Sequence, residues 1–382
     1  MAQIHGQLDP KFEELRDLFQ KNLDSKAEVG ASINLNIAGK DVVDIWGGFT
    51  DEECTQPWES DTIVGVWSST KGVASLALLM LIDRGLVDTD AKVAKYWPEF
   101  AANGKQDIEI RHIMSHTSGL SAWEEKVTWD DVCDQDSAAA KLAAQAPLWE
   151  PGTASAYHVI TFGVLIAEVV KRVTGKPLKQ FVAEEIAAPL KADFQIGLLD
   201  KDAPRVSNVI PQKDTPPPRE APEAGSVAFK TFTNPALGAG MLRSETIRKA
   251  DLSSFNGFAN ARAMNRIFSV LALGGEVNGV RLLSQKTIEL IFREQSNGTD
   301  IATGQVLRWG IGYALGGSGL VDFMPTGRIG VWGGWGGSLF VFDADRKLTF
   351  TYAMNQMSHN IMANGREGGY LRAVYQALGV EV

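Results

Sequence analysis

The feature that most constrains the fold of this chain is a pair of strand–turn–strand patterns at its opposite ends. Near the N-terminus, polar and apolar residues alternate over 32–37, Gly39 and Lys40 turn the chain, and residues 42–46 return as a second strand. Near the C-terminus, SLFVFDADRKLTFTYAMN places an Asp-rich turn at 343–346 between two strands. Because the segments between these ends are helical, we expect one sheet built from both ends, with a mostly helical lobe inserted into it. The predicted fold class is α/β (α+β).

Helical patterns complete this arrangement. Apolar residues at helical spacing follow Pro10, and the segment EGGYLRAVYQALG closes the chain as a second terminal helix. In the middle of the chain, three apolar helical segments each end at glycine, as helices often do. These three segments cover residues 71–84, 161–174 and 261–273.

The same patterns predict the domain organisation. We expect a single domain over residues 1–382, with an α/β lobe from about 1–65 and 305–382 and a mostly helical lobe over about 66–304. The proline-rich stretch 211–225 is too short to link two compact units. We interpret it as a surface loop near the mouth of a site.

Charge and composition exclude several classes of partner. The net charge is −9 and no run of Lys or Arg is long, so neither nucleic acid nor an anionic membrane is an expected partner. The longest apolar run, 73–82, is too short to span a bilayer, and the N-terminus lacks the pattern of a signal peptide. The two cysteines, Cys54 and Cys133, are expected to be reduced thiols. We therefore expect a soluble, cytoplasmic protein.

A Ser-x-x-Lys motif opens the first of the three central helices. Ser68 and Lys71 are three residues apart, so on a helix they share a face and the lysine amine can take the serine proton. The amide N–H at the first turn of a helix is unpaired and favours negative charge. Ser69 fits less well, because its i+3 partner is Gly72. The alternative is an ordinary core helix, since a chain of this length contains about one such motif by chance.

Two further segments contain candidate site residues. Tyr157 follows a Pro-Gly turn and precedes a strong helical pattern, so its hydroxyl is placed either to reach across a cleft or to lie at the surface. The segment GVWGGWGGSLFVF, from Gly330 to Phe342, surrounds two tryptophans with glycines. Glycine allows a backbone to approach a ligand closely, although a glycine-rich edge strand packed on a helix has the same pattern.

Competing signals are weaker. His112 and His116 are four residues apart, a spacing found in metal sites, but no motif places a third ligand. We interpret His116 as a residue that anchors its own turn, and we expect no metal. The chain also has no Gly-x-Ser-x-Gly, the motif that marks the nucleophile of α/β-hydrolases.

Together, the Ser-x-x-Lys motif, the tyrosine after PGT and the glycine-rich strand resemble the serine β-lactamase/penicillin-binding-protein superfamily. The flanking segments DTIVGVWSSTKGV and IEIRHIMSHTSGLSAW look like its matching segments, and the likeness extends from about residue 33 to 356. Within it, NGFANARAMNRIFSVLALGGEVNGVRLLS and the Trp-Gly-Gly at 332–334 are most similar to family VIII carboxylesterases. The resemblance implies a β-lactamase/transpeptidase-like fold, in which N- and C-terminal helices flank the antiparallel sheet.

The resemblance also implies residue roles. Ser68 becomes the acylated nucleophile, and Lys71 and Tyr157 become the pair that moves its proton. The residues alone do not say which of the two is the base, because their titrations are coupled. The backbone N–H groups of Ser68 and Trp335 become the oxyanion hole. No cofactor is implied.

Two departures from the superfamily pattern bear on the substrate. Its Tyr-x-Asn is Tyr157-His158-Val159 here, and its Lys-Thr-Gly is Trp332-Gly333-Gly334. β-Lactamases use the missing Asn and Lys to hold the amide and the carboxylate of their substrate, and a neutral indole cannot pair with a carboxylate. We therefore expect an apolar, aromatic pocket formed at Trp332, Gly333 and Gly334 and walled by Trp123 and Trp335. His158 either faces this pocket or lies outside it.

The predicted function is cleavage of carboxylic esters, those with short acyl groups above all, through an acyl-enzyme on Ser68. The first alternative is an acyltransferase or transesterase that moves an acyl group from a thioester to an alcohol in natural-product biosynthesis. The sequence favours a β-lactamase or a D-amino-acid peptidase less, and it favours a non-catalytic scaffold least, because Ser68, Lys71 and Tyr157 are all present. The expected partner is a small-molecule ester or thioester, and the sequence does not indicate an oligomeric state.

Overall fold

A nine-stranded antiparallel sheet organises the computed structural model, which describes residues 2–212, 221–321, 323–358 and 365–382. The two ends of the chain meet in its middle, where β2 pairs with β15 from Ile37 opposite Leu348 to Ala31 opposite Met354. In spatial order the strands are β1 (Ile4–Leu8), β3 (Lys40–Gly48), β2 (Gly30–Ile37), β15 (Leu348–Met354), β14 (Leu339–Asp343), β13 (Ile329–Gly333), β12 (Ala314–Leu315), β11 (Val306–Trp309) and β10 (Ser296–Thr299). The predicted α/β fold with an antiparallel sheet is confirmed.

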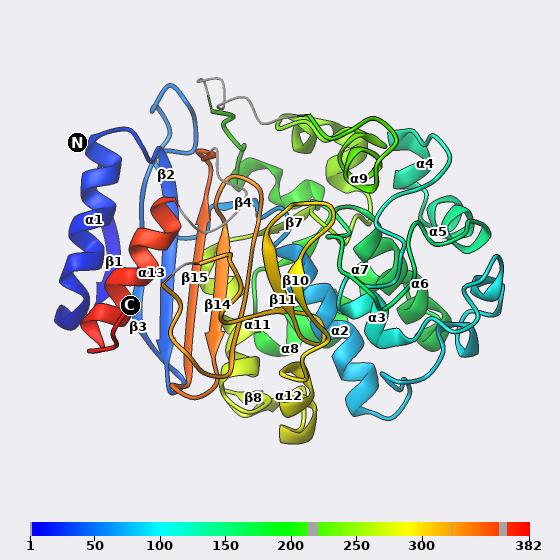
Figure 1. Cartoon of the computed structure of the whole chain (residues 1–382). Coiled ribbons are helices and arrows are strands. Elements are labelled where there is room, and N and C mark those ends of the chain that lie inside the picture. The colour runs from blue at the N-terminus through cyan, green and yellow to red at the C-terminus, as the bar shows by residue number, and fades with distance from the viewer. Residues whose placement is uncertain (1, 213–220, 322, 359–364) are drawn as a thin grey trace.

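Helices cover both faces of this sheet. Figure 1 shows α1 (Glu13–Asp24) and α13 (Arg366–Ala377) packed together in front of the strands, and α11 (Ala261–Ala272) behind them. α11 contacts β2, β14 and β15, and its strongly amphipathic sequence turns a continuous apolar face to the sheet. The terminal helices and the two terminal hairpins therefore form one layered unit, as the sequence predicts.

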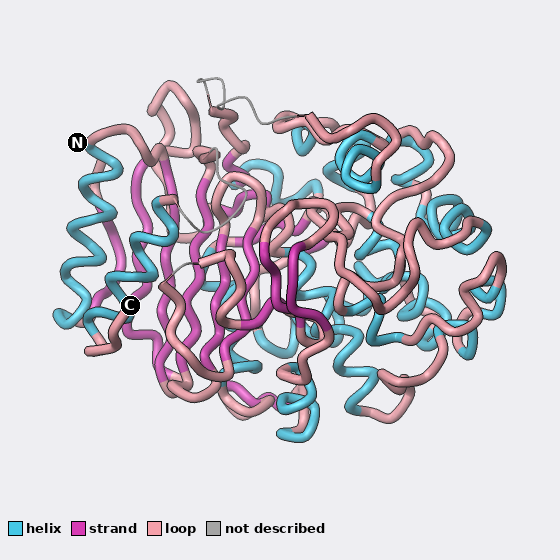
Figure 2. Tube along the Cα trace, in the orientation of Figure 1, coloured by secondary structure: helices cyan, strands magenta, loops and turns pink. Residues whose placement is uncertain are grey.

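The helical lobe lies beside the sheet (Figure 2) and is built around α2 (Thr70–Asp83). Every residue of α2 from Thr70 to Leu81 is buried, because α6 (Thr161–Thr174), α7 (Leu178–Val182) and α12 (Gln285–Ile291) pack around it. The remaining helices of the lobe are short: α3 (Ile110–Met114), α4 (Trp129–Cys133), α5 (Gln135–Ala144), α8 (Ala188–Leu190), α9 (Val227–Thr233) and α10 (Glu245–Lys249). Among the described residues, no helix is long and apolar enough to cross a membrane.

Two small sheets accompany the large one. One has the order β5 (Gln195–Ile196), β7 (Gly257–Ala259), β4 (Ile63–Gly65) and β6 (Val206–Ser207); the other pairs β8 (Glu276–Val277) with β9 (Val280–Arg281). β4 leads directly into the turn before α2. This connection fixes where the Ser-x-x-Lys segment emerges from the core.

The three predicted central helices are confirmed, each to within one residue at either end, in α2, α6 and α11. Two differences concern the edges of the large sheet. β1 precedes the first helix and was not predicted, because IHGQL lacks the alternation of a half-buried strand. β10 starts at Ser296, and α11 packs on the sheet, so elements that the sequence placed in the 66–304 helical lobe belong to the sheet layer.

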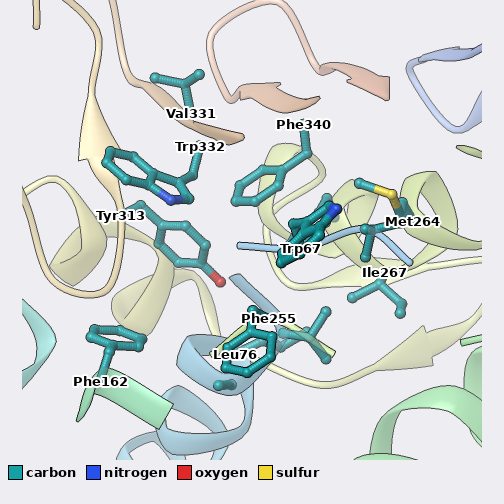
Figure 3. Packing of buried hydrophobic residues seen from close by; sticks show 14 of the residues in the cluster. Trp67, Leu76, Phe162, Phe255, Met264, Ile267, Tyr313, Val331, Trp332 and Phe340 are labelled. Atoms are coloured by element: carbon teal, nitrogen blue, oxygen red, sulfur yellow. The ribbon is translucent and has the colours of Figure 1, made fainter. Parts of the chain in front are cut away.

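A continuous apolar core connects the sheet to α2. Figure 3 shows Phe340 of β14 close to Trp67, with Met264 and Ile267 of α11 beside them. Gly72 of α2 lies directly against the stacked rings of Phe268 and Phe340, where a Cβ atom would collide with both. This close approach holds the start of α2 against the sheet.

Candidate active site

The turn between β4 and α2 presents Ser68. Trp67 has a φ of +48°, a left-handed conformation that is costly for a residue with a side chain. The backbone then bends immediately into α2, with Lys71 N–H donating to the Ser68 carbonyl at 3.0 Å. Ser68 is only half-buried, whereas the flanking Trp67 and Ser69 are each 1% exposed. The strained turn thus directs one hydroxyl toward an open space and buries its neighbours.

Lys71 lies beneath Ser68 in an apolar environment. Its Nζ atom lies 3.3 Å from Ser68 Oγ and donates to the carbonyl oxygens of Val159 at 2.7 Å and Ser254 at 3.0 Å. Among the described residues, no carboxylate pairs with it. Burial therefore disfavours the ammonium form and lowers the pKa of Lys71 well below its usual value. This lysine is suited to accept a proton.

The Tyr157 ring packs against the Lys71 amine. The Lys71 Nζ atom lies 4.9 Å from the centre of the Tyr157 ring, and the indole N–H of Trp332 donates to the Tyr157 hydroxyl at 3.1 Å. Burial, the largest effect, raises the pKa of Tyr157, although hydrogen bonds from Ser68 and Trp332 oppose it. The phenol is therefore protonated in the resting site. The structure brings Ser68, Lys71 and Tyr157 together in one cluster.

Two unpaired amide groups lie near Ser68. In the described part of the chain, neither the Ser68 N–H nor the Trp335 N–H donates to a protein acceptor. Trp335 belongs to the turn between β13 and β14, which is closed by hydrogen bonds from Gly334 N–H to Ser338 O at 2.7 Å and from Gly337 N–H to Gly334 O at 3.0 Å. The Trp335 ring contacts the Trp67 ring edge-on, with 5.1 Å between centroids. The two amides are thus on neighbouring backbone segments, as an oxyanion hole requires.

An apolar cavity of about 410 Å³ opens above Ser68. Its wall is largely aromatic and is formed by Trp67, Tyr157, Phe232, Phe255, Trp332 and Trp335. Apart from Ser68 and Tyr157, its polar side chains are Thr303 and Gln305, and no charged side chain is among the described lining residues. Pro222, from the predicted proline-rich loop, also lines the cavity; residues 213–220 of that loop lie outside the described residues.

Three candidate pocket residues do not line the cavity, one of which, His158, the sequence left open. Trp123 is buried away from the cavity, because its indole N–H donates to the Ala138 carbonyl of α5 at 3.0 Å. Gly334 lies behind the wall, packed so closely on the Val66 carbonyl and Ser338 that a Cβ atom there would collide with both. His158 also lies outside the cavity. Trp332, Gly333 and Trp335 do line it.

The histidines anchor loops. His158 is fully buried, with Nδ1 donating to the Ala156 carbonyl at 2.6 Å and Nε2 accepting from Ser118 Oγ at 2.7 Å. Burial lowers its pKa to about 3, so it stays neutral. His116 Nδ1 accepts from the His158 backbone N–H at 3.0 Å and so ties its turn to the Tyr157 segment, rather than only to itself. The described residues contain no group of side chains that could hold a metal ion.

Asp300 is a buried residue of this site that the sequence did not reveal. It is fully buried, and its carboxylate accepts from Tyr157 N–H at 3.1 Å and from Ser155 Oγ at 2.9 Å. It also accepts from the N–H groups of Ala302 and Thr303, which line the cavity. One carboxylate thus joins the Tyr157 segment to the loop that forms part of the cavity wall. Its sequence context, NGTDIATG, resembles an ordinary turn.

We expect Asp300→Ala to destabilise the protein strongly. The substitution leaves several buried N–H and O–H donors without an acceptor, which costs about 3 kcal/mol or more in the free energy of unfolding. Urea denaturation followed by fluorescence measures the change. Asp200→Ala, which removes a solvent-exposed partner of Lys249, is the control and should change the midpoint little. Equal midpoints for the two variants would contradict the anchoring role.

The fold and this site define a serine hydrolase of the β-lactamase fold. The chain belongs to the Beta-lactamase family, which matches residues 15–370. The predicted superfamily is thereby confirmed.

The proteins that this chain resembles include esterases. The esterase/beta-lactamase LipL of Mycobacterium tuberculosis is 31% identical over 377 residues, which cover 96% of this chain and 86% of LipL. The crystal structure of a family VIII carboxylesterase is 37% identical and has a TM-score of 0.91, covering 98% of this chain and all of that one. The monacolin J acid methylbutanoyltransferase of Aspergillus terreus is 30% identical over 162 residues, which cover 36% of this chain and 39% of that protein.

Proposed function

We propose that the protein hydrolyses neutral carboxylic esters through an acyl-enzyme on Ser68. The observation that carries the proposal is the position of Lys71, a buried amine 3.3 Å from the Ser68 hydroxyl, with no carboxylate among the described residues to keep it charged. Two backbone carbonyls accept the two N–H bonds of the neutral amine, so its lone pair is free to face Ser68. A serine hydroxyl needs such a base to become a nucleophile.

Acylation follows from these contacts. Lys71 Nζ takes the Ser68 proton as Oγ bonds to the ester carbonyl carbon, and the carbonyl oxygen becomes an oxyanion held by the Ser68 and Trp335 N–H groups. When the intermediate collapses, the bond to the leaving alcohol breaks. The alcohol oxygen takes a proton from the Tyr157 hydroxyl, which is replenished by Lys71. Water then attacks the acyl carbon as it gives a proton to the same pair. The second tetrahedral intermediate collapses, the bond between the acyl carbon and Ser68 Oγ breaks, and Oγ takes that proton back as the carboxylic acid leaves.

The cavity supports a neutral substrate. A carboxylate on the substrate would lose its hydration against six aromatic side chains and meet no cation among the described lining residues. We expect methyl 4-(butyryloxy)benzoate to be cleaved with a kcat/KM about 10- to 100-fold above that of 4-(butyryloxy)benzoic acid, after correction for the uncatalysed rates. The two esters share an acyl group and differ in one charge. Product chromatography measures both, and equal efficiencies would contradict the proposal.

Acyl transfer to an alcohol is the second candidate. It is favoured by the aromatic cavity, which holds an apolar alcohol near Ser68 more readily than it holds water, and by the partial likeness to an acyltransferase. The neutral ester assayed with and without added 1-butanol separates the two reactions. Butyl butyrate formed in excess of butyric acid, at low millimolar alcohol, would assign the protein to the transferases.

A further inference from the structure

Ser69, the second serine of the doubled pair, has a hydroxyl that points into the protein. It is 1% exposed, and its Oγ atom lies 3.0 Å from the Oγ atom of Ser338. No lysine or other base contacts it in the described part of the chain. Ser69 is therefore not an alternative nucleophile to Ser68. Its hydroxyl instead makes a hydrogen bond to Ser338, which belongs to another segment of the site.

The direction of this hydrogen bond follows from proton counting. Ser338 Oγ lies 2.7 Å from the Val66 carbonyl oxygen, which cannot donate, so the single Ser338 proton goes to Val66. The Ser69 hydroxyl must then donate to Ser338. The Val66 carbonyl also accepts the Ser69 backbone N–H at 3.1 Å. The result is a closed set of hydrogen bonds among Val66, Ser69 and Ser338.

These hydrogen bonds join the two backbone segments that carry the unpaired amides. Val66 and Ser69 bracket Ser68, and Ser338 closes the turn that contains Trp335. Gly334 of the same turn packs on the Val66 carbonyl with no room for a side chain. The two segments come from different parts of the fold, the turn before α2 and the β13–β14 turn. Among the described residues, two hydrogen bonds that involve a side chain join these two turns. One links the hydroxyls of Ser69 and Ser338, and the other runs from the Ser338 hydroxyl to the Val66 carbonyl.

We propose that Ser69 and Ser338 are positioning residues that set the spacing of the Ser68 and Trp335 N–H groups, and so act on the acylation transition state without touching the substrate. The proposal rests on the proposed function. An oxyanion hole works only if its donors are held where charge develops, and small displacements lower the rate steeply. A serine pair that merely packed the core would affect stability and leave transition-state binding unchanged.

The test measures acylation by stopped flow with 4-nitrophenyl butyrate, which gives the acylation rate constant and the substrate dissociation constant separately. We expect Ser338→Ala to lower the rate constant about 20-fold and Ser69→Ala about 5-fold, with dissociation constants within about 2-fold of the starting protein. The double variant should match Ser338→Ala alone, because either change breaks the same bond. Multiplied effects, or a loss confined to the dissociation constant, would overturn the proposal.

A second measurement excludes a purely structural role. Phenylboronic acid forms a tetrahedral adduct with a serine nucleophile and places a hydroxyl in the oxyanion hole, whereas phenol only occupies the cavity. In the two serine variants, the inhibition constant of phenylboronic acid should rise by the same factor as the acylation rate constant falls. The inhibition constant of phenol should not change. Ser269→Ala is the matched control, since Ser269 in α11 is also 1% exposed and donates one hydrogen bond, to Asn265 at 2.7 Å.

The outcomes separate this inference from the proposed function. If the unsubstituted protein forms no acyl-enzyme, the proposed function fails before any variant is compared. If it acylates normally and both serine variants keep its acylation rate and its affinity for phenylboronic acid, only the positioning role is wrong. Should Ser338→Ala fail to fold, Ser69→Ala carries the same test, because it leaves the Ser338–Val66 bond in place.

Discussion

Ser68→Ala is expected to lower the kcat of ester hydrolysis by about 10⁴-fold or more, because it removes the atom that forms the acyl-enzyme. The fold should be unaffected, since Ser68 is half-buried and, among the described residues, its hydroxyl interacts with Lys71 and Tyr157 of the site itself. Hydrolysis of 4-nitrophenyl butyrate measures the rate. Intact-mass analysis after treatment with a fluorophosphonate measures the nucleophile directly: one adduct on the unsubstituted protein and none on the variant.

The neighbouring serine provides the control for this experiment. Ser69→Ala removes a hydroxyl one residue away, and it should retain the fluorophosphonate adduct and lose only about 5-fold in acylation rate, as its positioning role predicts. An adduct that persists in Ser68→Ala would show that another residue is acylated. Equal losses in the two variants would mean that the Ser68 substitution acts by disturbing the turn.

Lys71→Arg is expected to lower kcat/KM by about 10³-fold, although arginine is also a long basic side chain. The reason is that burial lowers the pKa of Lys71 and makes a neutral amine available, whereas a guanidinium stays protonated and cannot accept the Ser68 proton. The sign of the pH dependence follows. Below the pKa of Lys71 the amine carries the extra proton and the rate is low; as pH rises through that pKa, kcat/KM rises to a plateau. A pH–rate profile of kcat/KM should show this rising limb below the usual pKa of a lysine, because burial lowers the pKa of Lys71.

Tyr157→Phe separates the base from its partner. Phenylalanine keeps the ring that faces Lys71 at 4.9 Å and loses only the hydroxyl. We expect a loss of about 10²-fold in kcat, with the rise of rate with pH preserved, because Lys71 still titrates. Loss of that pH limb in Tyr157→Phe would assign the base to the tyrosine instead. A change in KM alone would mean that Tyr157 acts only as part of the cavity wall and not in proton transfer.

Local sequence patterns placed the main elements, and the family resemblance singled out the central residues of the site. Ser68 and Lys71 lie together because three residues of a helical turn bring them to one face, which spacing alone predicts. α2 could be delimited because its apolar run is long and ends at Gly85. The hairpin of β2 and β3 was visible because its polar and apolar residues alternate around a short turn.

The rest depended on contacts between segments far apart in the chain. Asp300 meets Tyr157 across 143 residues, and nothing in its neighbourhood marks it as a buried carboxylate. Trp123 and Trp332 are both buried tryptophans, yet one indole donates to α5 and the other to Tyr157. Which of two tryptophans faces a cavity is decided by packing, and no spacing rule within one segment reports it.

The pairing of β2 with β15 has a consequence for the order in which the protein can be made. β2, which ends at Ile37, leaves the ribosome long before its partner β15, which begins at Leu348. Until then, one edge of the β2–β3 hairpin has open N–H and C=O groups, which is a state prone to pairing with other chains. The β13–β14 turn, with Trp335 and Ser338, is also synthesised late. A nascent chain can therefore have its nucleophile in place and still lack half of its oxyanion hole.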